Sequence, residues 1–183
     1  MSKILFMGEL KVKENNYGVK IGKAYKAIIQ MHDDIKKLLM DCDNYFNLDV
    51  IFDNTVTSGF SYSIRNPVWL APGVFRYWLL EDSEVFGITI VLHSTEYEIK
   101  EPLLILGILD YNKDDVAEIK DVCNHWDLWN SVLDGTDEFS IGEVKEIDNV
   151  TDDGRINNIN YYVKPLFELN SFNDVKNCIE KLI

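Results

Sequence analysis

The pattern of hydrophobic positions is clearest between Ile21 and Phe46. Apolar side chains recur there at steps of three and four residues, while the lysines mostly fall outside this stripe. This spacing is typical of one face of an α-helix. A helix of about six turns with one apolar face is not stable alone in water, so it needs a partner surface of similar length. The pattern predicts a long amphipathic helix over residues 19–46, with a short strand or arm over residues 1–18.

After this helix the periodicity becomes that of strands. The runs with alternating or continuous apolar character are Phe60–Arg65, Val74–Leu80, Val85–His93 and Leu103–Leu109. The last two are apolar on both faces, which favours a central position in a sheet. Because no crossover helix fits between these runs, residues 50–110 are predicted to form an antiparallel meander.

The remaining residues, 111–183, mix helical and extended patterns. Helical spacing runs through Leu133, short strands are expected at Glu143–Ile147 and Ile159–Val163, and Ser171 is expected to cap a final helix. A polar loop is expected over Asn149–Asn158. The chain is therefore predicted to be a single α+β domain, with an antiparallel sheet of about four to six strands. The long N-terminal helix is expected across one face of that sheet, and two further helices in the C-terminal half.

The charge of the chain is strongly acidic and unevenly placed. The 183 residues carry 18 basic and 31 acidic side chains, a net charge of −13. Between Asp110 and Asp153 there are fourteen acids and three lysines. Such an excess argues against direct binding of nucleic acid, which needs a basic surface. It favours a basic protein partner, unless these charges are only solvated or pair with the basic face of the long helix.

The spacing of the cysteines and the hydropathy of the chain indicate its cellular compartment. Cys42, Cys123 and Cys178 are too scattered to form a disulfide framework or a zinc motif. The apolar run Ile4–Met7 is too short for a signal peptide, and no apolar run is long enough to span a bilayer. We therefore expect a cytoplasmic protein with reduced thiols and no cofactor.

One set of residues resembles a metal-dependent nuclease centre in its spacing. Asp82 is followed by Glu98 and Lys100, as when two carboxylates hold Mg²⁺ and a lysine positions the attacking water. Glu143-Val144-Lys145 repeats the acid-x-Lys part, so the pattern also arises in an ordinary charged strand. A nuclease-like enzyme with Asp82, Glu98 and Lys100 as its catalytic residues is kept as an alternative.

The opening of a calcium loop is present without the rest of it. Asp110-Tyr111-Asn112-Lys113-Asp114 begins like an EF-hand loop, but Asp115 stands where the loop requires glycine. A turn followed by a helix start is the favoured interpretation, and no metal site is predicted.

Two of the three arginines flank a proline-bracketed turn that carries a tryptophan. Arg65 and Trp69 precede Arg76 and Trp78, and alternation would place Arg76 and Trp78 on one strand face. Arginine beside tryptophan can form a rigid platform for a protein partner. The alternative interpretation buries Trp69 under the long helix and Trp78 against the 123–133 helix.

Together these features favour a non-enzymatic interaction or inhibitor protein that binds a basic protein partner through an acidic surface. Its sharper form is a nucleic-acid mimic of phage or mobile-element origin that binds a nucleic-acid-binding protein. A small-ligand module with an aromatic pocket is a second alternative, after the nuclease. The residues expected to bind the partner are Arg65, Trp69, Arg76, Trp78, Asp114, Asp115, Glu118, Asp137 and Glu138.

Overall fold

The structure is a computed structural model of the whole chain. It describes residues 16–52, 70–81, 83–94, 97, 99–112, 119–134, 140–148, 150 and 154–183. The chain divides into two compact units, residues 1–45 and 46–183. Each unit is described by itself.

The described part of the first unit is formed by the long helix α1, which spans Tyr17–Phe46, so that its last residue belongs to the second unit. The predicted helix over residues 19–46 is therefore confirmed. The buried side chains of α1 are Ile35, Leu39 and Cys42, all in its C-terminal half. No residue between Tyr17 and Asp34 is buried. The predicted position of α1 across the sheet remains a prediction.

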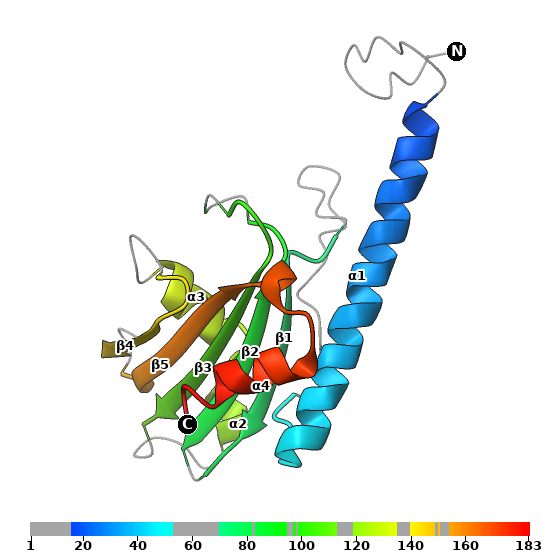
Figure 1. The fold of residues 1–183 in the computed structure, drawn as a ribbon. Coiled ribbons are helices and arrows are strands. Elements are labelled where there is room, and N and C mark those ends of the chain that lie inside the picture. The colour runs from blue at the N-terminus through cyan, green and yellow to red at the C-terminus, as the bar shows by residue number, and fades with distance from the viewer. Residues whose placement is uncertain are drawn as a thin grey trace. The chain divides into compact units, whose positions relative to one another are not determined.

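The second unit is built on a five-stranded antiparallel sheet with the order β1-β2-β3-β5-β4 (Figure 1). Its strands are β1 (Gly73–Leu79), β2 (Glu84–Val91), β3 (Leu103–Tyr111), β4 (Val144–Asp148) and β5 (Ile156–Pro165). The first three strands form an antiparallel meander over the last three of the four runs predicted for it, and β5 then pairs with β3. The predicted α+β class is confirmed.

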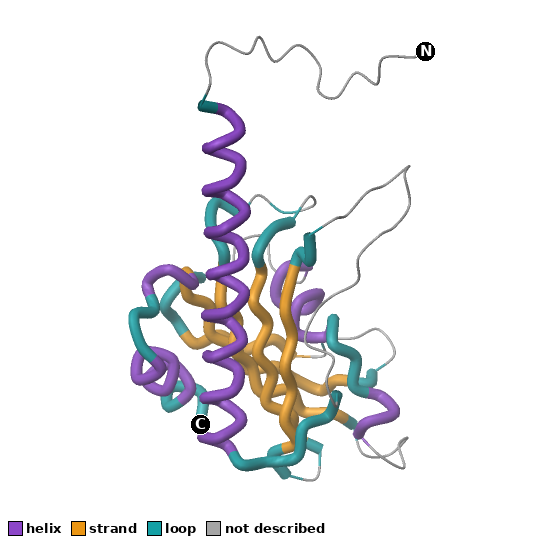
Figure 2. The backbone as a smooth tube through the Cα atoms, turned by 90° about the vertical axis from the view of Figure 1, so that its right-hand side faces the viewer, coloured by secondary structure: helices purple, strands orange, loops and turns teal. Residues whose placement is uncertain are grey.

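The sheet is covered by helices on both faces (Figures 1 and 2). Almost every residue of β2 is buried, and β3 is buried nearly throughout, as expected for central strands with two covered faces. One face carries α2 (Ile119–Val122) and α3 (Asp127–Asp134). The opposite face carries α4 (Phe172–Ile179), which follows the short 3₁₀-helix Leu166–Glu168.

Helix α3 packs against two glycines of the central strands. Gly87 on β2 pairs directly with Gly107 on β3. A Cβ atom at Gly107 would lie 2.5 Å from Leu128 Cδ1, and one at Gly87 would lie 3.3 Å from Leu128 Cδ2. The absence of side chains at these positions lets the fully buried Leu128 reach the backbone of the sheet. Burial of a leucine of this kind contributes about 1.5–3 kcal/mol.

Helix α4 is started by the predicted serine. The Ser171 side chain and the Asp174 carboxylate form a capping box, in which Asp174 accepts hydrogen bonds from the backbone N–H groups of Asn170 and Ser171. These hydrogen bonds lower the pKa of the partly exposed Asp174 carboxyl. The buried face of α4 consists of Val175, Cys178 and Ile179.

Two boundaries differ from the sequence-based expectation. The helical spacing through Leu133 does not form one helix, because the chain turns at Cys123–Trp126 between α2 and α3. In this turn the Asn124 side chain accepts a hydrogen bond from the Trp126 N–H, which satisfies the backbone outside a helix. The polar loop expected up to Asn158 ends earlier, since β5 begins at Ile156.

The two edges of the sheet are different. The outer edge of β1 is covered by the chain at Asp49–Ile51, through hydrogen bonds from Ile51 N to Tyr77 O (3.0 Å) and from Leu79 N to Asp49 O (2.9 Å). Among the described residues no strand lies outside β4, which forms the other edge. The exposed residues of β4 are Val144, Lys145, Glu146 and Asp148.

Some predicted segments lie outside the described residues. They are the arm before residue 16 and the strand Phe60–Arg65. In the part of the chain that is described, no helix is both long and apolar enough to cross a membrane.

Candidate functional site

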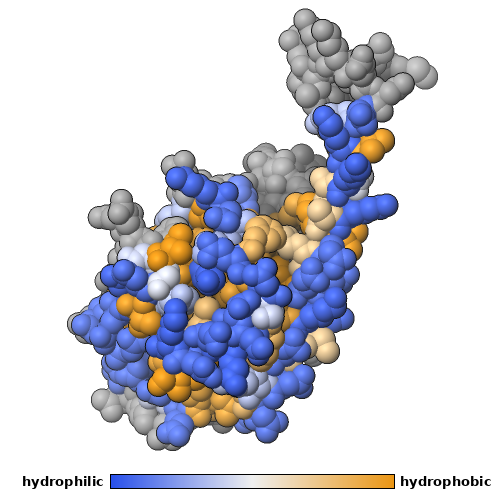
Figure 3. All heavy atoms as spheres, in the orientation of Figure 1, coloured by the Kyte–Doolittle hydropathy of each residue, from blue (hydrophilic) through white to orange (hydrophobic). Residues whose placement is uncertain are grey.

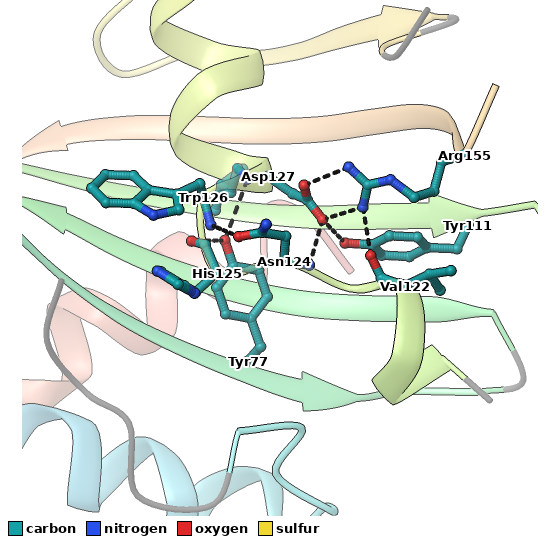
Figure 4. Close-up of polar contacts among 9 residues, drawn as sticks. Tyr77, Tyr111, Val122, Asn124, His125, Trp126, Asp127 and Arg155 are labelled. Carbon is teal, nitrogen blue, oxygen red and sulfur yellow. Dashed lines mark hydrogen bonds and ion pairs between the residues drawn. The ribbon is translucent and has the colours of Figure 1, made fainter. Parts of the chain in front are cut away.

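The most organised polar group of the structure is centred on a buried carboxylate at the start of α3 (Figure 4). The Asp127 side chain is 7% exposed and forms a bidentate pair with Arg155, which lies just before β5. Arg155 Nη1 donates to Asp127 Oδ2 and Nη2 to Oδ1, both at 2.8 Å. This fork geometry is the strongest pairing of a guanidinium with a carboxylate.

Two further donors and one acceptor complete the surroundings of this ion pair. The Tyr111 hydroxyl donates to Asp127 Oδ2 at 2.6 Å, and the Asn124 backbone N–H donates to the same oxygen at 2.8 Å. Arg155 Nη1 also donates to the Val122 carbonyl at 2.6 Å. The network therefore joins β3, the end of α2, the start of α3 and the start of β5.

Tyr77, on β1, forms hydrogen bonds with the turn between α2 and α3. Its hydroxyl donates to the His125 carbonyl at 3.1 Å and accepts the Leu128 N–H at 3.3 Å. Both tyrosines point from the sheet toward the Asn124–Asp127 turn in Figure 4. Side chains from β1, β3 and the residue before β5 thus hold the turn through hydrogen bonds, so its position does not depend on loop packing alone.

The turn presents a cluster of aromatic rings. The His125 ring lies 5.3 Å from Phe75, 5.4 Å from Trp126 and 6.0 Å from Phe52, as distances between ring centroids. Trp126 also contacts Phe75 at 5.0 Å and Trp129 at 5.5 Å. Phe75 and Trp129 are buried, whereas Phe52, His125 and Trp126 remain partly exposed. Four of these five contacts are edge-to-face, and such pairs add about 0.5–1.5 kcal/mol each beyond burial.

The titratable groups beside this network are held in their neutral forms. Burial raises the pKa of the Cys123 thiol to about 12 and raises the pKa of both Tyr77 and Tyr111. A thiol with such a pKa carries almost no thiolate at neutral pH, so Cys123 is not an activated nucleophile. The geometry is that of a structural network that positions a surface.

The pH dependence of folding stability tests whether the His125 ring is partly buried among these aromatic rings. Partial burial among the rings lowers its pKa below the ordinary value of 6.5, although nearby Asp127 opposes the shift. In the window between the lowered folded-state pKa and 6.5, the unfolded chain binds more protons than the folded chain, so stability falls on acidification. Urea unfolding at pH 7.5 and pH 5.5 should show a larger loss for the native chain than for His125→Phe. Replacement of the exposed His93 by Phe is the control, and equal losses in the native chain and His125→Phe would contradict this assignment.

The proposed arginine–tryptophan platform is not present at Trp78. This side chain is fully buried, with its ring 5.1 Å from Phe46 and 5.9 Å from Phe86. Its burial also differs from the alternative interpretation, because Trp78 lies on the sheet face opposite α3. Arg76 is partly exposed on β1, while Arg65 and Trp69 lie outside the described residues.

The other predicted site residues are mostly outside the described part of the chain. This applies to the partner-binding acids Asp114, Asp115, Glu118, Asp137 and Glu138, and to the nuclease candidates Asp82 and Glu98. Lys100, the third nuclease candidate, is exposed. Within the described ranges no three His, Cys, Asp or Glu residues are grouped so as to hold a metal ion. The nuclease and small-ligand alternatives therefore remain predictions.

Some acids of the 110–153 segment are described, and they divide into inward and outward groups. Asp127 is buried against Arg155, and Asp110 accepts hydrogen bonds from Ser83 (3.2 Å) and Asn157 (3.1 Å). Glu146 and Asp148 are exposed on the edge strand β4. Because alternate residues of a strand share a face, these two carboxylates point to the same side of the sheet.

The Asp127–Arg155 network was missed by the sequence interpretation. The available signal was an acid at the start of the Leu128–Leu133 apolar spacing, the helix position where carboxylates are favoured. Arg155 is one of three arginines in the chain, but 28 residues separate it from Asp127, so no local pattern joins them.

The architecture and site define an α+β protein whose described polar network organises a surface turn. Comparison with known proteins adds no identification: no family model matches the chain, and no curated protein or solved structure matches it significantly.

Proposed function

We propose that this chain is a non-enzymatic interaction or inhibitor protein that binds a basic protein partner through acidic surface residues. The observation that carries the proposal is the edge strand β4, where Glu146 and Asp148 are exposed on one face at the border of the sheet. Exposed carboxylates at fixed spacing attract cationic side chains and steer their approach. The net charge of −13 also favours a positively charged partner.

The network around Asp127 supports a binding role over a catalytic one. Its carboxylate is saturated by Arg155, Tyr111 and the Asn124 N–H, so it has little capacity left for a substrate. Nucleic-acid mimicry is the finer form of this proposal, in which carboxylates take the place of phosphates in a basic groove.

Capture of proteins on the immobilised full chain tests the proposal. Proteins retained at low salt should be biased to basic isoelectric points and should elute as salt shortens the Debye length from about 30 Å at 0.01 M to about 8 Å at 0.15 M. The double variant Glu146→Gln/Asp148→Asn should retain them several-fold less. Glu168→Gln/Glu180→Gln is the matched control, because these carboxylates lie near Lys164 and Lys176 instead. Retention with no basic bias, unaffected by salt and by the β4 variant, would refute the proposal.

A further inference from the structure

Helix α1 contains a heptad repeat that runs through its whole length. With heptad positions written a to g and Ile21 placed at a, every a and every d position is apolar. The a positions are Ile21, Ile28, Ile35 and Cys42, and the d positions are Tyr17, Ala24, Met31, Leu38 and Tyr45. A 3.5-residue repeat sustained over about four heptads is the signature of a helix that packs along another long helix.

The N-terminal half of this seam has no partner within the described part of the first unit. No residue from Tyr17 to Asp34 is buried, and Ile21 is 37% exposed. Figure 3 shows apolar side chains beside polar ones along this part of α1. Nothing lies within 4 Å of a Cβ atom built at Gly18 or Gly22, and glycine inside a helix is less favourable than alanine. This half of α1 is therefore weakly stabilised by its own sequence and gains from association.

We infer that α1 pairs with α1 of a second copy of this chain as a parallel, in-register coiled coil over its N-terminal half. Isoleucine is favoured at the a positions of parallel dimers, and this half carries it at Ile21 and Ile28, whereas its d positions are Tyr17, Ala24 and Met31 in place of leucine. The flanking positions agree with this arrangement. The e positions Gly18, Tyr25 and His32 carry no carboxylate or lysine, while the g positions are Lys20, Ala27 and Asp34.

Because g residues face the next e residue of the partner helix, these contacts bring no pair of like charges together. Lys23 and Lys26 occupy the outer c and f positions, away from the seam. This assignment is independent of the proposed binding function of β4.

Sedimentation equilibrium on the full chain tests the inference. Mass should rise from monomer to dimer with concentration, and Ile28→Asp should weaken the dimer at least tenfold. Val19→Asp is the matched control, since Val19 is 53% exposed at an outer f position of the same helix. A monomer at every concentration, or equal effects of Ile28→Asp and Val19→Asp, would overturn the inference.

Oxidative cross-linking fixes the orientation and remains informative if Ile28→Asp unfolds the helix. Ile21→Cys should give a covalent dimer on a non-reducing gel, because two a residues face each other in a parallel pair, whereas Val19→Cys should not. A dimer that Ile21→Cys fails to cross-link would exclude the parallel register. The chain could instead stay monomeric and bind phosphatidylserine vesicles through Lys20, Lys23 and Lys26. That result would overturn the inference and show that this part of α1 binds an anionic lipid surface.

Discussion

Replacement of Asp127 by Ala is expected to lower the free energy of unfolding by about 3–5 kcal/mol, because it leaves a partly buried guanidinium without its carboxylate. Arg155 is 24% exposed and makes two hydrogen bonds of 2.8 Å to the Asp127 carboxylate. The same change removes the acceptor of the Tyr111 hydroxyl and of the Asn124 N–H. Urea denaturation followed by tryptophan fluorescence measures the loss.

Two further variants distinguish the stability lost with the ion pair from the stability lost with any single carboxylate. Asp121→Ala removes an exposed carboxylate of α2 and should change stability by no more than about 0.5 kcal/mol. The double replacement Asp127→Leu/Arg155→Met removes both charges and should be less damaging than Asp127→Ala. A loss below about 1 kcal/mol for Asp127→Ala would mean that the pair does not hold the turn.

Replacement of Gly107 by Val is expected to destabilise the second unit by about 1–3 kcal/mol through overpacking. The new Cβ atom would be placed 2.5 Å from Cδ1 of the fully buried Leu128, a separation at which one of the two must shift. Thermal unfolding of the purified variant measures the effect.

The paired substitution Leu128→Ala supplies the control for this contact. Alone it should cost about 2–5 kcal/mol, since it leaves a cavity between α3 and the sheet. Combined with Gly107→Val it should cost less than the sum of the two single changes, because the valine fills part of the vacated space. Strict additivity would show that the two residues do not share this contact.

The regular elements could be predicted because each has a local periodicity. The stripe from Ile21 to Phe46 and the apolar runs of β2 and β3 report their own structure through side-chain spacing. The capping box at Ser171 is also local, with its acid three residues later. The register of β4 on β5 has no comparable local signal.

What could not be predicted depends on contacts between distant residues. The turn that ends α2 is stabilised by Tyr111 and Arg155, which lie 16 and 28 residues from Asp127. Trp78 was misjudged for a related reason: strand alternation gives the face of a side chain but not whether that face is covered. Here both faces of β1 are largely buried.

The charged border formed by β4 also determines which strands can be added to this sheet. A second β4 laid antiparallel alongside the first would bring Glu146 and Asp148 of both chains into one row, and like charges directly opposite one another are destabilising. A lysine-rich strand would meet no such repulsion. The charges of edge strand β4 should therefore disfavour pairing with the β4 of an identical chain at neutral pH. They should not disfavour pairing with a strand of opposite charge.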